Sequence, residues 1–158
     1  MASVYKWITT AVGPVKLIAD TKNLVAILWE NSKDFPLEAS LTEDINHPIL
    51  CATESQLAEF FSGKRHSFDL PLDPQGTPFQ KDVWKALSEI PFGATVSYSF
   101  IAQKIGRSKA VRAVGTAIGR NPYSIVVPCH RVIGTNGELT GFAGGLAIKK
   151  MLLDFEGS

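Results

Sequence analysis

Residues 97–119 read SYSFIAQKIGRSKAVRAVGTAIG, and their pattern is the most informative about the fold of the second half of the chain. It predicts a short helix over 98–105, with Ser97 as its N-cap, and a second helix over 109–118. Gly106 would end the first helix and open the turn. Two short helices joined by a tight turn with glycine form a helix-turn-helix, which occurs in DNA-binding proteins and also in α proteins that never bind DNA.

The second predicted helix, with Ser108 as its cap, consists mainly of small residues around one long cation, Arg112. A slim helix of this kind can lie close to a duplex backbone and insert its cation. It can equally pack tightly in a protein core, which we expect of Ala113 and Val114. The small Ala102 on the first helix would let the two helices touch.

Basic side chains dominate the region around this motif. Residues 1–72 carry 6 basic and 9 acidic residues, a net charge of −3, whereas residues 73–158 carry 10 and 6, a net charge of +4. No acidic residue stands between Glu89 and Glu138, and the cations in that interval are Lys104, Arg107, Lys109, Arg112, Arg120 and Arg131. An ordinary solvated face would mix both signs, so this distribution favours a surface that binds a polyanion such as nucleic acid.

Further elements surround the motif in the second half of the chain. Helices are predicted over 79–90 and 146–155, each with apolar residues on one face. Between them, a strand-like apolar run over 125–134 contains Cys129. Asn136-Gly137 then predicts a hairpin turn. This half of the chain is therefore expected to be mostly helical.

The heptapeptide Val127–Ile133 combines a cysteine with two potential cations. Cys129 stands beside His130 and Arg131 in an otherwise apolar run. Neighbouring cations lower the pKa of a thiol, and apolar surroundings raise it. Free cysteine is often a buried structural residue, but the proline, histidine and arginine around this thiol favour a reactive site. Because adjacent residues of a strand face opposite sides, we expect His130 to reach Cys129 through a water.

Glu156 follows the last predicted helix. A carboxylate at a helix C-terminus interacts unfavourably with the helix macrodipole. Glu156 is therefore either a surface residue on a frayed end or the partner of a cation or an imidazole, for which His130 is the candidate. A carboxylate bound to an imidazole fixes its tautomer and raises its basicity.

The first third of the chain predicts a small antiparallel sheet followed by a helix. Short runs rich in Val, Ile, Tyr and Trp alternate with turn residues, and short connections favour antiparallel pairing. The predicted strands span 5–10, 15–20 and 24–30, a polar loop spans 31–46, and the helix spans 49–61. The prolines and glycine of 68–76 mark a boundary, which predicts an α/β (α+β) protein with domains at 1–72 and 73–158.

Composition excludes several classes of protein. The 158 residues are 45% hydrophobic and 20% charged, as in ordinary globular proteins. No apolar stretch approaches the ~20 residues of a membrane helix, and the first residues lack the apolar core of a secretory signal. We expect a cytoplasmic, reducing location in which Cys129 and Cys51 stay unpaired, with Cys51 packed as an apolar residue. The absence of CxxC and HxxxH pairs argues against zinc.

Taken together, the motifs resemble those of the O6-alkylguanine-DNA alkyltransferase family, the methylated-DNA–protein-cysteine methyltransferases. The matching stretches occur in the order of the family and cover residues 77–156: Thr77-Pro78-Phe79-Gln80 with Val83-Trp84, Gly93-Ala94-Thr95-Val96-Ser97-Tyr98, Arg112-Ala113-Val114-Gly115, Asn121-Pro122, Pro128-Cys129-His130-Arg131-Val132, Gly144-Gly145-Leu146, and Leu152-Leu153 with Glu156. The resemblance implies a ribonuclease-H-like N-terminal domain and a C-terminal domain whose helix-turn-helix is winged-helix-like.

The resemblance also implies catalytic roles for five residues. Cys129 would be the nucleophile that accepts the alkyl group, and His130 its base through a water. Glu156 would orient the imidazole, and Asn121 would brace the turn that leads to the cysteine. Tyr98 would lie near the flipped guanine and neutralise charge that develops on the base.

The DNA-binding residues implied by the resemblance lie on and around the second helix of the motif. Arg112 would enter the space that the flipped base leaves, with the helix in the minor groove. The residues expected to contact DNA are Ser97, Lys109, Arg112, Ala113, Gly115 and Arg120. Those expected to line the guanine pocket are Arg131, Val132, Phe142, Ala143 and Gly144. Ala143 stands where some relatives have a hydroxyl residue, which puts one contact to guanine in doubt.

The expected partner is double-stranded DNA containing O6-alkylguanine, and O4-alkylthymine is a second candidate lesion. The zinc ligands of some relatives have no counterpart in this chain, so neither a metal nor another cofactor is expected. We expect a monomer, located in the cytoplasm or, in a eukaryote, in the nucleus. Because a thioether is a poor leaving group, the reaction should stop after one transfer for each molecule.

Three other functions remain to be separated from this one. An alkyltransferase-like damage sensor would share the scaffold but lack the cysteine that is present here. A cysteine hydrolase would place its cysteine and histidine far apart in sequence. A purely structural helix-turn-helix would leave the cluster Pro128–Arg131 without a role.

Overall fold

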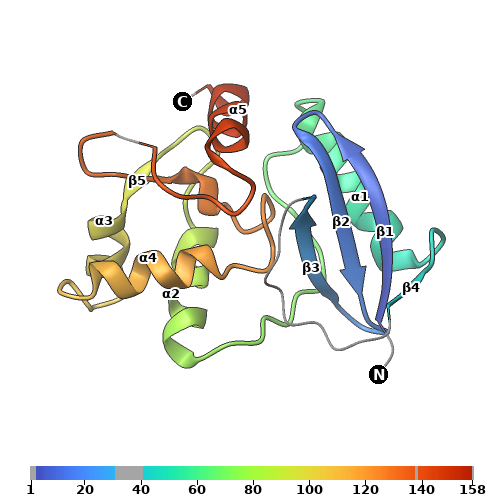
Figure 1. The fold of residues 1–158 in the computed structure, drawn as a ribbon, viewed down its shortest axis with the longest axis horizontal. Helices are drawn as coiled ribbons and strands as arrows, with labels where there is room; N and C mark the ends of the chain where they lie inside the picture. The colour runs from blue at the N-terminus through green and yellow to red at the C-terminus, as the bar shows by residue number, and fades with distance from the viewer. Residues whose placement is uncertain (1–2, 31–40, 138, 158) are drawn as a thin grey trace. The chain divides into compact units, whose positions relative to one another are not determined.

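The computed structural model describes residues 3–30, 41–137 and 139–157. The chain divides into two compact units, Met1–Pro74 (unit 1) and Gln75–Ser158 (unit 2). The elements in chain order are β1 (Ser3–Thr10), β2 (Gly13–Ala19), β3 (Leu24–Trp29), β4 (Leu41–Glu43), α1 (Pro48–Phe61), α2 (Pro78–Ser88), β5 (Val96–Ser97), α3 (Tyr98–Lys104), α4 (Val111–Gly119), the 3₁₀ helix η1 (Cys129–Arg131), β6 (Val132–Ile133) and α5 (Leu146–Glu156) (Figure 1). The predicted α/β fold class is confirmed. Within the described ranges, no helix combines the length and the apolar character that crossing a bilayer requires.

The sheet of unit 1 has the strand order β3-β2-β1-β4. The first three strands form the predicted antiparallel meander, with Ile8 opposite Val15 and Leu17 opposite Ile27. A fourth strand that was not predicted, β4, pairs with β1 in parallel. β4 lies inside the predicted polar loop over 31–46, of which residues 31–40 lie outside the described part of the chain.

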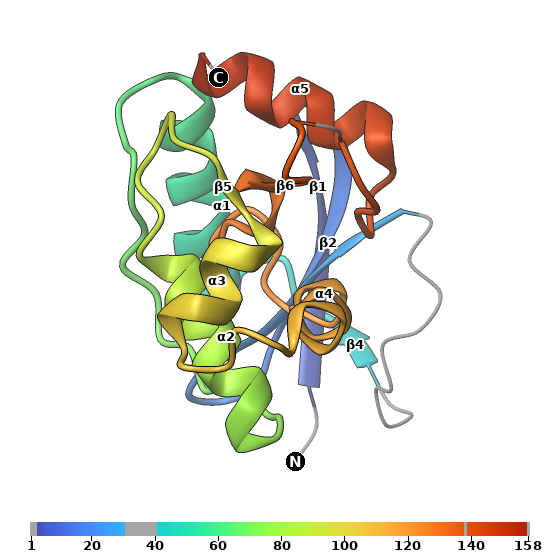
Figure 2. The ribbon, with the colours of Figure 1, turned by 90° about the vertical axis from the view of Figure 1, so that its left-hand side faces the viewer.

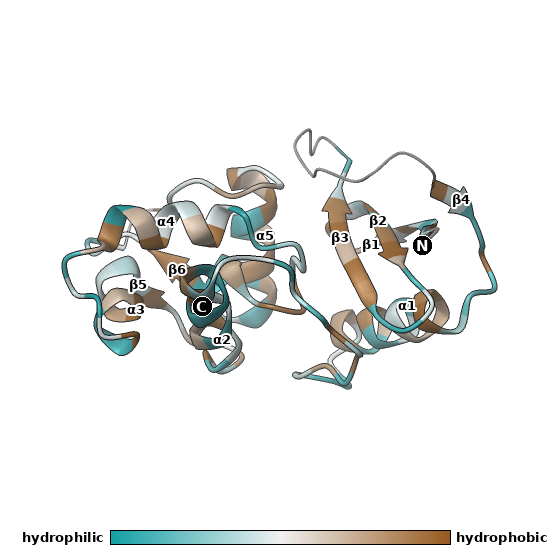
Figure 3. Ribbon diagram, turned by 90° about the horizontal axis from the view of Figure 1, so that it is seen from below, coloured by the Kyte–Doolittle hydropathy of each residue, from teal (hydrophilic) through white to brown (hydrophobic). Residues whose placement is uncertain are grey.

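Helix α1 covers one face of this sheet, as Figure 1 shows. Alternate residues of the strands point to that face, and Val15, Leu17 and Ile27 are almost fully buried. Leu57 and Phe60 of α1 are buried as well. The hydrophobic colour along β2 and β3 in Figure 3 shows the strands that supply this core.

Unit 2 is built on three helices that pack against one another, α2, α3 and α4 (Figure 2). Thr77 and Gln80 form a reciprocal capping box at the start of α2. The indole Nε1 of Trp84 donates to the carbonyl of Ala117 at 2.8 Å, which ties α2 to α4 in the buried core. Ala102 of α3 is fully buried, as the small residue of the motif is expected to be.

Helices α3 and α4 form the predicted helix-turn-helix. Ser97 caps α3, and Gly106 has the positive φ of 76° that ends it. The prediction that Ser108 caps the second helix is wrong. The amide of Ala110 donates to the carbonyl of Arg107 at 2.8 Å, so the turn continues to Ala110 and α4 begins there without a side-chain cap.

The run before Cys129 is a compact turn, and the predicted strand there is wrong. The amide of Val127 donates to the carbonyl of Tyr123 at 2.8 Å, and Ile125 has a φ of 73°, rare for a β-branched residue. Cys129 itself begins η1. The apolar residues of this run indicate burial, which a strand and a buried turn share, so their pattern did not distinguish the two. The argument that strand neighbours face opposite sides therefore does not apply to Cys129 and His130.

Strand β6 pairs in parallel with β5, with Val96 opposite Val132. The amide of Gly137 donates to the carbonyl of Gly134 at 2.8 Å, so a turn forms where Asn136-Gly137 predicts one. No returning strand follows it within the described residues, and Glu138 lies outside them. The chain then reaches α5, whose residues Leu152 and Glu156 are buried.

Candidate active site

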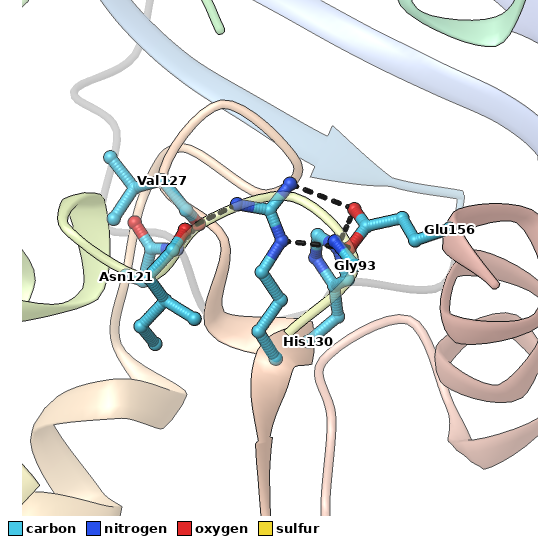
Figure 4. Close-up of polar contacts among 7 residues, drawn as sticks. Gly93, Asn121, Val127, His130 and Glu156 are labelled. Carbon is cyan, nitrogen blue, oxygen red and sulfur yellow. Dashed lines mark hydrogen bonds and ion pairs between the residues drawn. The ribbon is translucent and has the colours of Figure 1, made fainter. Parts of the chain in front are cut away.

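Asn121 holds the turn that presents Cys129. Its side-chain amide donates to the carbonyl of Val127 at 2.8 Å, and its side-chain oxygen accepts from the amide of Tyr123 at 2.9 Å (Figure 4). One side chain therefore closes both ends of the turn, and the loop that ends at Cys129 is held without strand pairing.

The Cys129 side chain is buried, with 6% of the residue exposed. Burial raises the pKa of the thiol above its usual value, because a thiolate is poorly solvated there. A hydrogen bond with Asn121 and the positive charge of Lys149 act in the opposite direction without reversing the shift. The resting residue is thus a thiol that needs a base to become a thiolate.

His130 lies beside it with its side chain fully buried. Its Nε2 is 2.7 Å from Oε2 of Glu156. Its Nδ1 is buried and has no hydrogen-bond partner among the described residues. Burial lowers the pKa of His130, and the charges of Arg131 and Lys149 act in the same direction, whereas Glu156 raises it. A neutral imidazole with an unoccupied Nδ1 is suited to accept a proton.

Glu156 is the carboxylate of the cluster and is 6% exposed. Its Oε1 accepts from Nε of Arg131 at 2.8 Å and from the amide of Gly93 at 3.3 Å, while its Oε2 accepts from an Nη of Arg131 at 2.9 Å. Burial raises the pKa of Glu156, but the hydrogen bonds from His130 and Arg131 outweigh it and lower the pKa to about 2. The carboxylate is therefore ionised, and Nε2 of His130 must be the donor to it.

Arg131, expected to line the pocket, lies in this ion pair instead. Its remaining Nη donates to the carbonyl of Ile90 at 2.7 Å, and its guanidinium lies 5.8 Å from the ring centre of Phe92. Figure 4 shows the cluster, with Gly93, His130 and Glu156 together.

Lys149 is a site residue that the sequence reasoning missed. Its side chain is buried, and Nζ donates to the carbonyls of Val132 at 2.6 Å and Thr140 at 3.1 Å. Burial lowers the pKa of Lys149, and the nearby Cys129 raises it. Its position in the sequence could have revealed it. Lys149 lies three residues before Leu152, on the face of α5 that is buried and where an apolar residue is the norm.

Tyr98 lies at the start of α3 and is half-buried. Its hydroxyl shares a hydrogen bond with Oγ1 of Thr140, whose carbonyl accepts from Lys149. A methyl group added at Gly115 of α4 would stand 3.8 Å from the Tyr98 ring, so Gly115 faces this tyrosine. Thr140, which was also missed, therefore connects the predicted Tyr98 with the lysine beside the thiol.

The residues expected to bind DNA divide by exposure. Lys109, Arg112, Ala113 and Arg120 are exposed, and the core position expected of Ala113 is wrong, whereas Val114 is fully buried. Ser97 is half-buried, and its hydroxyl already accepts the amide of Phe100 at 3.0 Å as the cap of α3. The three exposed cations form no ion pair with another described side chain, which leaves them available to phosphates.

The residues expected to line a pocket lie on two segments. Val132 and Gly144 are buried, Phe142 is half-buried and Ala143 is exposed. The amide of Gly145 donates to the carbonyl of Phe142 at 2.9 Å and turns the chain into α5. No group of three or more His, Cys, Asp or Glu residues in the described ranges is arranged to hold a metal ion.

Two family models match almost the whole chain. The model described as the ribonuclease-like domain of 6-O-methylguanine DNA methyltransferase matches residues 3–74. The model described as the DNA-binding domain of the same protein matches residues 78–158. The two halves of the chain are thus similar to the two domains of 6-O-methylguanine DNA methyltransferase, in order.

Relatives of similar length share one name, methylated-DNA–protein-cysteine methyltransferase. The methylated-DNA–protein-cysteine methyltransferase of Methanosarcina acetivorans is 46% identical over 98% of each chain, and the constitutive one of Bacillus subtilis is 44% identical over 94% of this chain and 93% of its own. Among solved structures, O6-methylguanine methyltransferase of Mycobacterium tuberculosis is 42% identical, with a TM-score of 0.89 over 98% of this chain and 92% of that one. A structure of the M. tuberculosis protein in complex with DNA has a TM-score of 0.89 at 40% identity, over 99% and 92%.

Proposed function

Because the chain belongs to the 6-O-methylguanine DNA methyltransferase family, we propose that Cys129 is the cysteine that accepts the alkyl group. The activity is that of a methylated-DNA–protein-cysteine methyltransferase, a DNA repair reaction that moves the alkyl group of O6-alkylguanine onto the protein itself. The other cysteine, Cys51, lies in unit 1, where its thiol donates to the carbonyl of Ile45 at 3.4 Å. The histidine one turn before it, His47, caps α1, and its Nδ1 accepts from the amide of Ile49 at 3.2 Å.

The reaction begins with removal of the thiol proton of Cys129. The base is Nδ1 of His130, reached through a water, and the imidazolium that forms keeps its Nε2–H on Glu156. The thiolate sulfur then attacks the alkyl carbon. A carbon–sulfur bond forms, the bond from carbon to O6 breaks, and its electron pair stays on the guanine.

The guanine leaves as an anion that must gain a proton. The hydroxyl of Tyr98 is the group we assign to stabilise this charge, because it lies on α3 and faces Gly115 of the DNA-binding helix. Thr140 shares a hydrogen bond with this hydroxyl through Oγ1 and accepts from Lys149 at its backbone carbonyl. The Tyr98 hydroxyl gives its proton to the guanine and regains one from the solvent. The products are S-alkylcysteine and an unmodified guanine. None of the described groups is placed to cleave a thioether, so one transfer for each molecule is expected.

The lesion must leave the base stack to meet a buried thiol, at a cost of a few kcal/mol. Helix α4 is the element we assign to the minor groove, because it exposes Arg112 and Ala113 and contains Gly115. A slim helix allows close approach to the duplex, and Arg112 can occupy the space of the flipped base. Lys109 and Arg120 would contact phosphates at either end of the helix.

The observation that carries the proposal is the hydrogen-bond arrangement of His130. Its Nε2 donates to an ionised Glu156, and its buried Nδ1 is unoccupied among the described residues. A buried ring nitrogen without a protein partner is uncommon, and a role as proton acceptor explains it. The alternative of a DNA-binding damage sensor without transfer activity is not favoured, because Cys129 is present and the near full-length relatives are methyltransferases.

Further parts of the proposal concern the partner and the setting. The partner is double-stranded DNA with O6-alkylguanine, bound by a monomer in the cytoplasm without a cofactor. Unit 2 would contain the whole alkyl-acceptor site, which supports domains at 1–72 and 73–158 with separate roles. A ribonuclease-like domain over the first of these is supported by the family match to residues 3–74.

Intact-protein mass spectrometry tests the proposal. After incubation with a duplex that contains O6-methylguanine, the protein should gain one methyl group, and peptide mapping should place it on Cys129. The variant Cys129→Ser should gain none while still binding the duplex, and the matched variant Cys51→Ser should react like the parent protein. A methyl group on Cys51, or labelling of Cys129→Ser, would refute the assignment.

A further inference from the structure

Arg131 is adjacent to the proposed nucleophile and base, yet the reaction described above gives it no role. Its guanidinium forms two parallel hydrogen bonds with Glu156, from Nε at 2.8 Å and from an Nη at 2.9 Å. This pair is buried, and a third hydrogen bond at 2.7 Å fixes the guanidinium to the carbonyl of Ile90. Such a forked pair is the strongest and most directional contact that a carboxylate makes with a side chain.

We propose that Arg131 is a positioning residue of the alkyl transfer, which takes up the charge of Glu156 so that His130 stays a neutral imidazole with Nδ1 free for the thiol proton. This inference rests on the proposed function of Cys129 and His130. It differs from the usual arrangement of cysteine, histidine and acid, in which the carboxylate has the imidazole as its sole cationic partner.

The charges around His130 support this role. The groups whose charges act on its ring are Glu156, Arg131 and Lys149, and the Cys129 thiol is its chain neighbour. A guanidinium is always charged, so Arg131 already neutralises the one carboxylate of the cluster. An imidazolium at His130 would then be an unbalanced positive charge in a buried site that also contains Lys149, which is costly.

The hydrogen bonds of Glu156 also fix the tautomer of His130. Arg131 and the amide of Gly93 occupy Oε1, and Arg131 and His130 share Oε2. The two hydrogen bonds from Arg131 fix the orientation of the Glu156 carboxylate. Oε2 therefore accepts from His130 in a single direction. Nε2 therefore carries the hydrogen and Nδ1 the lone pair, which matches the unpartnered Nδ1 among the described residues.

Nitrogen NMR of the unaltered protein gives the first test. With ¹⁵N-labelled histidine, His130 should show a neutral ring at pH 7, with Nε2 protonated and Nδ1 not. This measurement does not depend on whether alkyl transfer to Cys129 occurs, so it can fail or succeed separately from the proposed function. A charged ring at pH 7, or the opposite tautomer, would overturn the inference about Arg131.

Two variants at Arg131 separate charge from shape. Arg131→Met removes the charge, so Glu156 is left with His130 as its cationic partner. The pKa of His130 should then rise by about one unit or more, and the acidic limb of the transfer rate against pH should move up by the same amount. Arg131→Lys keeps a charge without the fork and should leave that limb in place while it lowers the rate several-fold.

A purely structural arginine would behave differently. Both variants would then lower the transfer rate by a similar factor at every pH, and the titration of His130 would not move. That outcome would overturn the inference even if methyl transfer to Cys129 had been demonstrated. If Arg131→Met does not fold, Arg131→Gln decides the question, because it also removes the charge but keeps a hydrogen-bond donor, and it should show the same rise in the pKa of His130 and in the acidic limb.

Discussion

At the scale of single residues, the site combines a thiol that resists ionisation with a base that resists protonation. Burial raises the pKa of Cys129 and lowers the pKa of His130. A resting thiolate–imidazolium pair is therefore disfavoured. A cysteine that reacts once benefits from this arrangement, because a thiol is less prone to oxidation than a thiolate.

Lys149 is the charged side chain that favours the thiolate of Cys129. Its replacement in Lys149→Met should slow methyl transfer about tenfold at neutral pH, since a shift of one unit in the pKa of Cys129 changes the thiolate fraction tenfold. The rate of Cys129 alkylation by iodoacetamide against pH measures the same shift. The matched control is Lys150→Met, which removes an exposed lysine paired with Asp154 at 2.8 Å. Equal rates for both variants would contradict the role of Lys149.

Glu156 should make stability depend on pH in the acid range. Its pKa is about 2 in the folded protein against 4.5 for the ordinary group. The unfolded chain therefore takes up this proton first as the pH falls, and the contribution of Glu156, about 3 kcal/mol at neutral pH, should be lost between about pH 5 and pH 2. Urea unfolding at a series of pH values measures the loss, and ¹³C NMR of the carboxyl group gives the midpoint. A midpoint near 4.5 would show that the ion pair with Arg131 does not hold the carboxylate ionised.

At the scale of secondary structure, α3 and α4 carry side chains with different proposed roles on either side of one turn. The start of α3 carries Tyr98, next to the loop that contains Thr140. Helix α4 exposes Arg112 while it buries Val114. Because Gly115 has no side chain, the ring of Tyr98 can lie against α4, the helix proposed to enter the minor groove.

Arg112→Ala tests the role of this helix. The variant should repair O6-methylguanine in duplex DNA at least tenfold more slowly, because the flipped-out state loses the side chain that fills the stack. Its reaction with free O6-benzylguanine, which needs no base flipping, should change less than about twofold. Arg112→Lys keeps the positive charge but not the shape of the guanidinium, so its rate on the same duplex separates the two contributions. Equal losses on duplex and free base would argue that Arg112 supports the fold instead.

At the scale of the whole molecule, charge is divided between the two units. The acidic first half and the basic second half nearly cancel, so the net charge of +1 conceals a basic region around α4. The structure refines this picture, because Arg131 and Lys149 are buried and unavailable to DNA. The exposed cations that remain in the acid-free interval include Arg107, Lys109, Arg112 and Arg120.

DNA affinity should therefore fall steeply with salt. Each phosphate contact releases counterions, so the logarithm of the binding constant should decrease linearly with the logarithm of the salt concentration. Lys109→Ala should reduce that slope by about 1 and weaken binding to all sequences equally. Fluorescence anisotropy of a labelled duplex at several salt concentrations measures both. A flat salt response would contradict the basic surface inferred for α4.

The elements that were predicted correctly depend on local signals. Ser97 and Thr77 cap helices because their hydroxyls lie three residues from the amides they accept. The meander β1–β3 follows from alternating apolar residues and short turns. The family resemblance rests on short motifs, such as the one around Cys129, whose order survives in the sequence. The caps and turns depend on contacts between residues that are close in the chain, and the motifs are read directly from the sequence. Both could therefore be predicted without the tertiary structure.

The roles of Arg131 and Lys149 became visible only in the folded chain. Arg131 meets Glu156 across 25 positions, and Lys149 meets the carbonyl of Val132 across 17. No local propensity encodes such contacts, because their energy arises when burial removes water from both partners at once. The same reason explains the buried turn before Cys129, whose apolar residues indicated burial without indicating their neighbours. It also explains why β4 was not predicted, because this short strand is mostly polar and is defined by its pairing with a distant part of the chain, β1.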